Sequence, residues 1–367
     1  MIDRFLRVLG LALLVAACSQ GDPPPLASSP QSRLEPQSRL ENDRYVTADG
    51  MALPLTVWQP QGPVRAVVIA VHGMNDYRLA WARPATRWAQ RGIVTLAFDQ
   101  RGFGGSGQRG AWYGAETLAA DVNGLAALAA RRYPGVPLFL IGESMGGAVA
   151  ILAATRDDAP EPLAGVILSA PAVWSPSWKN VLLRRLAELG GVVLPDLAMP
   201  PRGLLPPSSD DPAVLAQLQS DPMVIHDTRL ATLSAVVELM NTARRRGPTL
   251  RQPVLLLFGD EDVQVYRDGV AELSDALPSA TLALYPRGRH LLFRSLDGGR
   301  RADDVAAWII DRRAPLPTGA DGRGRLCRQH VVDPTACPAS PQLAMMGRAG
   351  QSSVDSPASL RINSTTP

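Results

Sequence analysis

One serine of this chain lies between glycines, in a setting that could make it a nucleophile. The stretch 142–147 reads GESMGG and contains the pattern G-x-S-x-G around Ser144. Glycines at these places allow a sharp turn between a strand and a helix, because close backbone neighbours leave no room for a Cβ. Such a turn would hold the Ser144 hydroxyl in the open, as acyl-transfer chemistry requires. The chain has 32 glycines, so a chance match with a structural serine is the alternative.

A serine nucleophile needs a base, and the base needs an orienting group. Two later loops offer both: GDEDVQV at 259–265 and PRGRHLLF at 286–293 each follow an apolar run. His290 is one of only four histidines, and it lies in a loop at a strand end. The order serine, acid, histidine is one in which such triads occur. Spacing alone leaves the choice among the three acids Asp260, Glu261 and Asp262 open.

The elements that must position these residues are short apolar runs that alternate with helical stretches. Six runs read as buried strands, because they are continuous and apolar on both faces. Helical sequence separates most of them, which is the pattern of βαβ units with a parallel sheet. An antiparallel hairpin is expected at the sheet edge from Arg44–Ala48 and Ala52–Trp58. The six predicted strands are Val64–Val71, Ile93–Phe98, Leu138–Ile141, Val166–Ser169, Val254–Phe258 and Thr281–Tyr285.

One long interruption of this alternation, about residues 172–251, predicts a lid. It carries two expected helices, Ser177–Leu189 and Thr228–Arg246, around a proline-rich middle. An insertion of this size beside the carboxyl ends of the strands would cover whatever binds there. An apolar stripe in the first helix could line a slot for an acyl chain, and packing between lid and core is the alternative. The stripe consists of Trp174, Trp178, Leu182, Leu183, Leu186 and Leu189.

Three motifs give the chain a resemblance to a known superfamily. HGMND at 72–76 follows a buried strand, DQRGFGGSG at 99–107 contains a spaced Asp, Arg and Gly series, and GESMGG forms the turn around Ser144. Together they resemble the α/β-hydrolase superfamily, and within it the monoacylglycerol lipases and lysophospholipases. The resemblance covers most of residues 44–313. It implies an α/β-hydrolase fold, in which a mostly parallel sheet is flanked by helices and carries a helical lid insertion.

The resemblance also implies roles for individual residues. Ser144 would be the nucleophile, Asp262 the orienting acid and His290 the general base. The backbone amides of Met74 and Met145 would form the oxyanion hole. The departures from the family pattern, in the lid and in one extra glycine of the 99–107 loop, concern the identity of the substrate.

Two neighbouring residues are expected to have structural roles. In the family the acid stands three residues after a glycine, which selects Asp262 after Gly259. Asp260 is then expected to cap the turn by bonding a backbone amide two residues on, and Glu261 to face solvent. His72 is interpreted as a ring packed under the oxyanion loop.

The two ends of the chain differ from its middle in composition. Arg4 and Arg7 precede the apolar stretch 8–17, which is too short to span a bilayer and predicts a signal peptide at 1–17. Residues 18–42 are rich in Pro, Ser and Gln and contain the repeat PQSRLEPQSRLE, so we expect a flexible tether. The hydrolase domain is expected at 43–313, and a largely disordered Pro/Ser-rich tail at 314–367.

The cysteines extend this interpretation. Leu-Val-Ala-Ala-Cys at 14–18 resembles the lipobox of bacterial lipoproteins, which implies lipidation of Cys18 and anchoring to the cell envelope. Ser19, directly after this cysteine, resembles the residue at that position in outer-membrane-directed lipoproteins, so the protein is expected at the outer membrane, facing the periplasm. An ordinary cleaved signal peptide with an incidental cysteine is the alternative to lipidation. Cys327 and Cys337 are the cysteines that remain, and a disulfide between them is expected in an oxidising compartment, with two unpaired thiols as the alternative.

Composition and spacing argue against several other classes of protein. A net charge of +3 does not favour a nucleic-acid platform. The GFGGSG stretch at 102–107 matches a dinucleotide-binding pattern, but no helix opens directly after it and no ribose-binding acid follows on a strand. The histidines and cysteines lack the close spacing of metal sites. No cofactor and no metal are therefore expected.

The predicted function is hydrolysis of carboxylic esters, of an acylglycerol or lysophospholipid type, through a serine triad and an acyl-enzyme. Two alternatives stay open. The first is an aminopeptidase of the proline-iminopeptidase type, whose lid would present carboxylates such as Glu188, Asp196 or Glu238 to a substrate ammonium. The second is a binding protein on the same fold without catalysis. A complete set of triad residues favours the enzyme.

Overall fold

The computed structural model describes residues 38–159, 163–175, 185, 188–199, 206–322 and 326. The expected signal peptide, Cys18, the two cysteines at 327 and 337 and most of the 314–367 tail lie outside these residues. Among the residues described, no helix is both long and apolar enough to cross a membrane.

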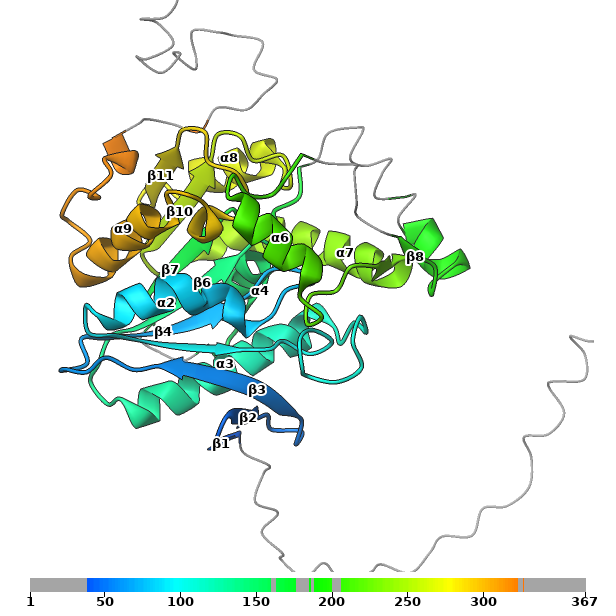
Figure 1. Ribbon diagram of the computed structural model, residues 1–367, viewed down its shortest axis with the longest axis horizontal. Helices are drawn as coiled ribbons and strands as arrows, with labels where there is room; N and C mark the ends of the chain where they lie inside the picture. The colour runs from blue at the N-terminus through cyan, green and yellow to red at the C-terminus, as the bar shows by residue number, and fades with distance from the viewer. Residues whose placement is uncertain are drawn as a thin grey trace, which may run out of the picture. The chain divides into compact units, whose positions relative to one another are not determined.

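In the part of the chain that the structure describes, nine strands form one sheet in the order β1-β2-β3-β5-β4-β6-β7-β10-β11 (Figure 1). The strands from β5 to β11 pair in parallel, whereas β1, β2, β3 and β5 pair antiparallel. The strands are β1 (Arg39–Glu41), β2 (Arg44–Val46), β3 (Ala52–Trp58), β4 (Ala66–Val71), β5 (Ile93–Phe98), β6 (Leu138–Glu143), β7 (Leu163–Ser169), β10 (Val254–Gly259) and β11 (Thr281–Tyr285).

The central strands are apolar along their whole length because helices cover both faces of the sheet. On β4, Val67, Ile69 and Val71 belong to one core cluster, and the alternating residues Ala66, Val68 and Ala70 belong to the other. The first cluster includes residues of α3 (Ala115–Arg132), α4 (Met145–Ala154) and α8 (Arg267–Ala276). The second includes α2 (Ala82–Ala89) and α9 (Gly298–Ile310). This two-sided covering is the arrangement that the α/β-hydrolase prediction requires, and the fold is confirmed.

The strand predictions are correct for all six runs, with boundaries that shift by up to three residues. The edge hairpin is also present, as β2 and β3. The sheet continues beyond it to β1, within the segment that was expected to belong to the tether. Arg39 pairs with Val46 there, so the folded part begins before residue 43.

At its other end the fold extends past the expected boundary at 313. Leu316 and Ala320 are buried in the second core cluster. The Thr318 hydroxyl and backbone amide both donate to the carboxylate of the buried Asp304 on α9, at 2.5 and 2.9 Å. The segment lacks periodicity, so composition alone predicts a tail. The buried side chains of Leu316 and Ala320 and the hydrogen bonds from Thr318 to Asp304 attach the segment to the domain.

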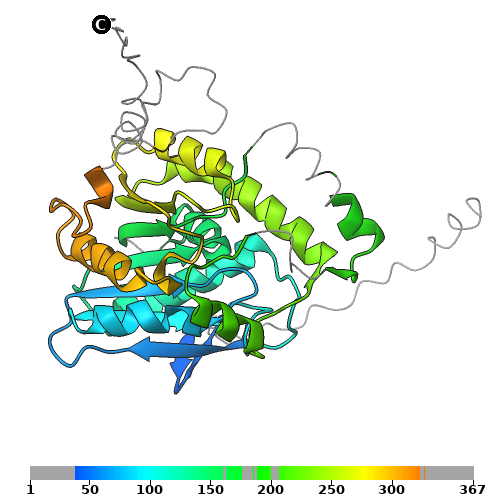
Figure 2. The same cartoon turned by 45° about the horizontal axis from the view of Figure 1, so that its top comes forward.

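The lid insertion contains helices α6 (Pro212–Ser220) and α7 (Leu230–Arg246) and the two-residue strands β8 (Ala198–Met199) and β9 (Thr228–Arg229). The segment around β8 lies farthest from the large sheet (Figures 1 and 2). The prediction of α7 is correct, and α6 was not predicted. Most of the expected helix at 177–189 lies outside the described residues. Of the proposed apolar stripe, Trp174 is buried against Tyr266, with ring centroids 5.1 Å apart, while Leu189 is 60% exposed.

Candidate active site

Ser144 occupies the turn between β6 and α4. Its φ of 56° and ψ of −121° are strained for a residue with a side chain, a geometry found at nucleophile turns of serine hydrolases. Backbone bonds fix this conformation: the Ser144 amide donates to the Ser169 carbonyl at 3.0 Å, and the Ser144 carbonyl accepts from Ala172 and Gly147, both at 2.9 Å. The side chain is partly exposed. The fold therefore presents this hydroxyl at the carboxyl end of a central strand.

The glycines around Ser144 are required by close backbone approach. A Cβ on Gly142 would lie 2.2 Å from the Gly146 carbonyl oxygen, and a Cβ on Gly146 would lie 2.2 Å from the carbonyl oxygen of Val71. Real Cβ atoms do not approach oxygen so closely, so only glycine fits either position. The turn is thereby pressed against the end of β4, where the oxyanion loop begins.

Asp262 and His290 follow the neighbouring parallel strands β10 and β11, and the structure brings them together. His290 Nδ1 lies 2.9 Å from Asp262 Oδ2, and both residues are buried. Asp262 Oδ1 accepts the Gln264 amide at 2.8 Å, which orients the carboxylate. Gly259 lets the two loops meet, because a Cβ there would lie 2.3 Å from the Gly288 carbonyl oxygen. A neutral His290 that donates from Nδ1 keeps Nε2 as a proton acceptor.

The other two acids of the same loop have different surroundings. Asp260 is exposed and lies 3.6 Å from Arg267, and Glu261 is exposed and lies 3.8 Å from Arg289. The expectation that Asp260 caps the turn is wrong. Asp262 itself accepts the amide two residues on, because its side chain points inward beneath the loop while that of Asp260 points to solvent.

The ionisation of His290 depends on two opposing effects. Burial lowers the pKa of an imidazole, because the charged form loses hydration. The charge of Asp262 and its hydrogen bond raise the pKa and outweigh burial, so that the pKa of His290 lies above its ordinary value. A base with such a pKa accepts a proton more readily than a free imidazole does.

The two backbone amides expected to form an oxyanion hole, those of Met74 and Met145, both belong to segments that adjoin the Ser144 turn. Met145 is the first residue of α4, so its N–H has no carbonyl partner within the helix. Met74 follows Gly73, whose Cα carries no side chain; a Cβ there would lie 3.4 Å from the Ser144 Cβ. The loop that carries Met74 therefore passes directly beside the nucleophile turn. The arrangement can supply two N–H donors to an anion formed next to Ser144.

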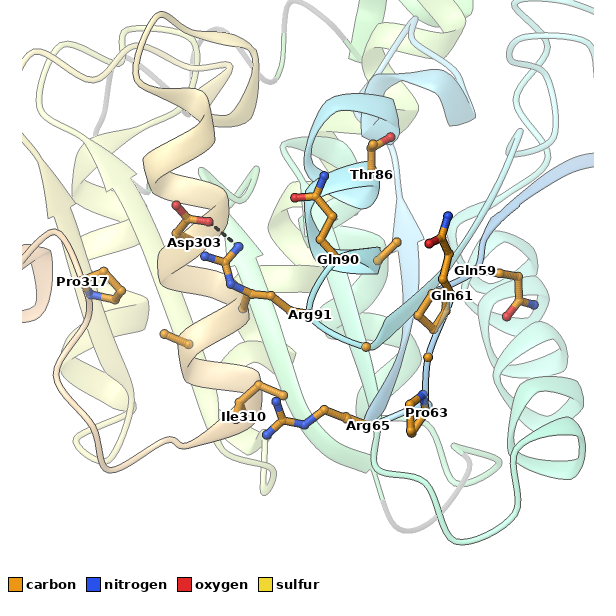
Figure 3. Close-up of a pocket in the computed structure, with 16 residues that line it drawn as sticks. Gln59, Gln61, Pro63, Arg65, Thr86, Gln90, Arg91, Asp303, Ile310 and Pro317 are labelled. Atoms are coloured by element: carbon orange, nitrogen blue, oxygen red, sulfur yellow. Dashed lines mark ion pairs between the residues drawn. The ribbon is translucent and has the colours of Figure 1, made fainter.

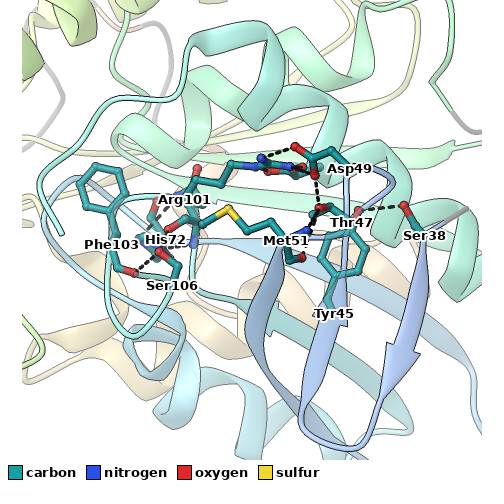
Figure 4. A network of polar contacts seen from close by, with 11 residues as sticks. Ser38, Tyr45, Thr47, Asp49, Met51, His72, Arg101, Phe103 and Ser106 are labelled. Carbon is teal, nitrogen blue, oxygen red and sulfur yellow. Dashed lines mark hydrogen bonds and ion pairs between the residues drawn. The ribbon is translucent and has the colours of Figure 1, made fainter. Parts of the chain in front are cut away.

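His72 supports this loop from below. The Gln100 amide donates to His72 Nε2 at 3.0 Å, so Nδ1 carries the proton and donates to the Gly73 carbonyl at 2.8 Å. Burial lowers the pKa of His72, which keeps the ring neutral. Phe103 packs edge-on against it, with ring centroids 5.8 Å apart, and the Ser106 hydroxyl bonds the Phe103 carbonyl (Figure 4). His72 acts as a structural support, as expected.

The glycine-rich loop at 102–107 serves the same support. Gly102 has a φ of +82°, and a Cβ on it would lie 2.0 Å from the Ala111 carbonyl oxygen. The Asp99 carboxylate accepts the amides of Gly105 and Arg78, both at 2.8 Å, and pairs with the Arg78 guanidinium. Gly102 is thus explained by its positive φ and by its close approach to Ala111. In the described part of the chain, no three His, Cys, Asp or Glu side chains are grouped to hold a metal ion.

A buried group of charges near Ser144 escaped the sequence analysis. Arg294 Nη2 lies 2.5 Å from Asp76 Oδ2 and 3.0 Å from Glu143 Oε2, and all three side chains are at least 90% buried. Glu143 precedes Ser144 directly, and Asp76 lies two residues after Met74. The sequence contained one indication of this group, because Arg294 is a charged residue that directly follows the apolar residues 291–293 after His290.

A larger depression lies away from these residues. It measures about 1100 Å³ and is bordered by the segment before β4, by α2 and by α9 (Figure 3). Arg91 and Asp303 form an ion pair at 2.5 Å on its wall. Its lining includes Arg65, which precedes β4, so it lies at the amino end of that strand, whereas Ser144, Asp262 and His290 follow the carboxyl ends of theirs. It is not part of the candidate site.

Comparison with known proteins identifies relatives along most of the chain. A monoacylglycerol lipase of Mycolicibacterium smegmatis is 29% identical over 271 residues, which are 72% of this chain and 95% of the relative. A monoglyceride lipase of Rattus norvegicus is 30% identical over 301 residues, 79% of this chain and 97% of the relative. The solved structure of a soluble variant of monoglyceride lipase from Saccharomyces cerevisiae superposes with a TM-score of 0.64 at 22% identity, covering 79% of this chain and 99% of that one.

A family model described as "Serine aminopeptidase, S33" matches residues 62–297, a range that contains Ser144, Asp262 and His290. The match extends over more than half of the chain, and the relatives agree with it in fold. The chain therefore belongs to this family of α/β-hydrolases, among its monoacylglycerol lipase-like serine hydrolases.

Proposed function

We propose that the protein hydrolyses carboxylic esters of the acylglycerol or lysophospholipid type through Ser144, His290 and Asp262. The observation that carries the proposal is the buried 2.9 Å bond between His290 and Asp262, at the same sheet edge as the strained Ser144 turn. The names of the relatives, monoacylglycerol and monoglyceride lipases, support the choice of ester.

In this mechanism Ser144 Oγ attacks the ester carbonyl carbon while His290 Nε2 takes the hydroxyl proton. Asp262 holds the ring and stabilises the imidazolium that forms. The amides of Met74 and Met145 donate to the oxyanion of the tetrahedral intermediate. When the ester C–O bond breaks, His290 returns the proton to the departing alcohol. A water molecule, deprotonated by the same nitrogen, then attacks the acyl-enzyme and releases the fatty acid and free Ser144.

The surroundings of the lid carboxylates favour ester over aminopeptidase chemistry. Glu188 pairs with Arg185 at 3.0 Å, and Glu238 pairs with Arg245 at 3.2 Å, both near the surface. Asp196 is exposed. Glu188 and Glu238, which are paired in this way, are poor candidates to bind a substrate ammonium. The family description nevertheless makes the peptidase the alternative that a test must address.

A substrate panel tests the proposal. Initial rates are measured for p-nitrophenyl acetate, butyrate and octanoate, for a monoacylglycerol, and for proline and alanine p-nitroanilides. We expect ester turnover with kcat/KM that rises from acetate to octanoate, because each buried methylene contributes about 0.8 kcal/mol. Anilide turnover above ester turnover would favour the aminopeptidase. No turnover of any compound by folded protein would favour a binding protein.

We also propose that the protein is exported and anchored through a lipid on Cys18, at the outer membrane facing the periplasm. The support is the sequence 14–18 and the basic, then apolar, segment before it. Metabolic labelling with an alkyne fatty acid in a Gram-negative host tests this. Labelled protein in the outer-membrane fraction, absent in Cys18→Ser, is the expected result; unlabelled protein in the periplasm would contradict it. A Cys327–Cys337 disulfide would appear in the same protein as a mass gain of about 2 Da on reduction.

A further inference from the structure

One guanidinium connects the three loops that carry the candidate catalytic groups. Arg294 belongs to η3 (Leu292–Arg294), four residues after His290. Its Nη2 contacts Asp76 in the oxyanion loop at 2.5 Å and Glu143 in the nucleophile turn at 3.0 Å. The residues of the Arg294–Glu143 bond are 151 positions apart in the chain. Among the other site residues that the structure describes, no side chain joins these three loops in this way.

Arg294, Asp76 and Glu143 form a buried group of charges. The side chains of Arg294 and Asp76 are 10% exposed and that of Glu143 is 4% exposed. A buried carboxylate next to another carboxylate is unfavourable unless a cation lies between them. Arg294 is that cation, and it is itself held where its backbone carbonyl accepts the Ser209 hydroxyl at 2.6 Å. Both carboxylates therefore bind the same nitrogen, Nη2 of Arg294.

The two carboxylates lie next to the atoms that would react. Asp76 is two residues after Met74, and its Oδ1 accepts the amide of Tyr77 at 2.9 Å, which fixes the end of the oxyanion loop. Glu143 is bonded to Ser144 through the peptide link. A shift of Arg294 would move the Met74 amide relative to the Ser144 hydroxyl. A displacement of about 1 Å in such a site can lower the rate about 100-fold.

We propose that Arg294 is a positioning residue, which through Asp76 and Glu143 holds the Met74 amide against Ser144. The inference rests on the proposed ester hydrolysis and deepens it. Arg294 does not touch the substrate in this account. It acts through the two loops to which it is bound.

The same group of charges faces His290. Asp262 contacts the ring from the β10 loop, Glu143 faces it from β6 and Arg294 from η3, while Asp76 faces Arg294. Arg289, the residue before His290 in the chain, has a side chain that is 33% exposed and pairs with Glu261 at 3.8 Å. Glu143 raises the pKa of His290 and Arg294 lowers it. Removing either charge should therefore move the pKa of His290, in opposite directions.

The first experiment compares Arg294→Met with Arg289→Met, a change of the same kind on the partly exposed arginine that precedes His290 in the chain. For Arg294→Met we expect kcat to fall about 10- to 100-fold with little change in KM. Affinity for a trifluoromethyl ketone, whose hemiketal oxyanion needs the two amides, should fall by a similar factor. Arg294→Lys should recover part of the loss. Arg289→Met should stay within about 3-fold of the wild type. A loss confined to KM, or equal losses in both Met variants, would overturn the proposal.

The second experiment remains informative if Arg294→Met does not fold, because Glu143→Gln and Asp76→Asn keep the shapes of their side chains. Histidine ring signals are titrated by NMR in protein with ¹³C-labelled histidine, with thermal melts as a check of folding. The pKa of His290 should fall in Glu143→Gln and rise in Arg294→Met. An unchanged pKa in both would overturn the role of the charges. Asp76→Asn should lower the affinity for the trifluoromethyl ketone while the melt stays near that of the wild type.

These readouts separate the inference from the function it rests on. NMR titration needs no substrate, so it tests the charge arrangement even in a protein that cleaves no ester. Absent ester turnover with the expected pKa shifts would reject the proposed function alone. Full ester turnover by every variant of the group would reject the role of Arg294 alone.

Discussion

At the scale of residues, burial distinguishes three carboxylates that are adjacent in sequence. Only Asp262 points inward to His290, whereas Asp260 and Glu261 pair with surface arginines. For Asp262→Asn we expect kcat to fall by up to about 10⁴-fold with a nearly unchanged melting temperature, because an amide stabilises the wrong tautomer of the base. Asp260→Asn serves as the matched control and should stay near the wild type. Loss of turnover in Asp260→Asn instead would assign the role to the other acid.

The raised pKa of His290 has a consequence for pH dependence. The base must be neutral to accept the Ser144 proton, so kcat/KM falls as the pH drops through this pKa. Because Asp262 raises the pKa, the acid limb of the wild-type profile should lie above the ordinary histidine value of 6.5. In Asp262→Asn the raising charge is gone, and the limb of the residual activity should move to lower pH. Profiles of kcat/KM between about pH 4 and 10 measure both; a limb that moves upward would contradict this assignment.

Sequence could identify some of these residues and not others. Ser144 and His290 each stand in a short motif after a strand, so local pattern and chain order suffice to select them. Asp262 is selected among three neighbouring acids only through the family resemblance. The contact of Arg294 with Glu143 has no local signature, because it joins distant residues through the fold. The inward direction of Asp262 likewise depends on how β10 and β11 meet at Gly259 and Gly288, which only the structure gives.

At the scale of elements, the lid is bound directly to the oxyanion loop. The Ile225 amide donates to the Asn75 carbonyl at 2.9 Å, the Asn75 side chain donates to the Thr228 hydroxyl at 2.7 Å, and the Tyr77 hydroxyl donates to Asp221 at 2.7 Å. Asn75 adopts a φ of 64°, which a bound side chain helps to maintain. The segment 221–228 therefore holds the backbone next to Met74.

Thr228→Val removes the hydroxyl and keeps the shape of the side chain. One hydrogen bond contributes about 0.5–1.5 kcal/mol, so we expect kcat to fall about 2- to 10-fold. Thr242→Val, on the exposed side of α7, is the control and should keep the wild-type kcat. Steady-state kinetics with one medium-chain ester compares them. Equal kcat in wild type and Thr228→Val would mean that the lid does not position this loop.

The elements that the sequence predicted well have clear apolar patterns. The six strands are short apolar runs, and α7 carries an apolar stripe at helical spacing. The tertiary contacts agree with both patterns. Helix α6 was missed because its sequence lies in a proline-rich stretch. Pro212 stands at its first position, where no amide donor is needed, and the Asp211 side chain caps the Ala213 amide at 3.0 Å. The pair Asp211 and Pro212, a cap residue followed by proline, was a signal in the sequence that predicts the start of this helix.

At the scale of the whole molecule, the domain closes with residues beyond its last helix. Leu316 is 3% exposed and packs in the core cluster that includes α2 and α9, whereas Leu296 is 72% exposed. Composition could not distinguish this segment from a tail, because a few scattered buried side chains (Leu316, Ala320 and Leu326) and one carboxylate partner produce no periodic pattern. The first strand of the sheet was missed because its three residues are exposed and it is recognised only by its pairing with β2.

The contribution of this segment can be measured directly. Leu316→Ala should lower the free energy of unfolding by about 2–4 kcal/mol, because it leaves a cavity in a packed core. Leu296→Ala should change it by less than about 0.5 kcal/mol, as exposed positions generally do. Urea unfolding followed by circular dichroism gives both values. Similar stability of the two variants would show that residues after 313 are not part of the cooperative unit.

The central claim is that Ser144 is a nucleophile activated by His290. Purified protein is incubated with a fluorophosphonate probe, and intact mass and peptide mapping locate the adduct. We expect one adduct per chain, on Ser144, absent in Ser144→Ala and formed at least about 100-fold more slowly in His290→Ala. Ser220→Ala is the control, because this serine of α6 is exposed and bonds only carbonyls of its own helix, and it should label like the wild type. Labelling that persists in Ser144→Ala, or an unlabelled wild type with a normal thermal melt, would contradict the account.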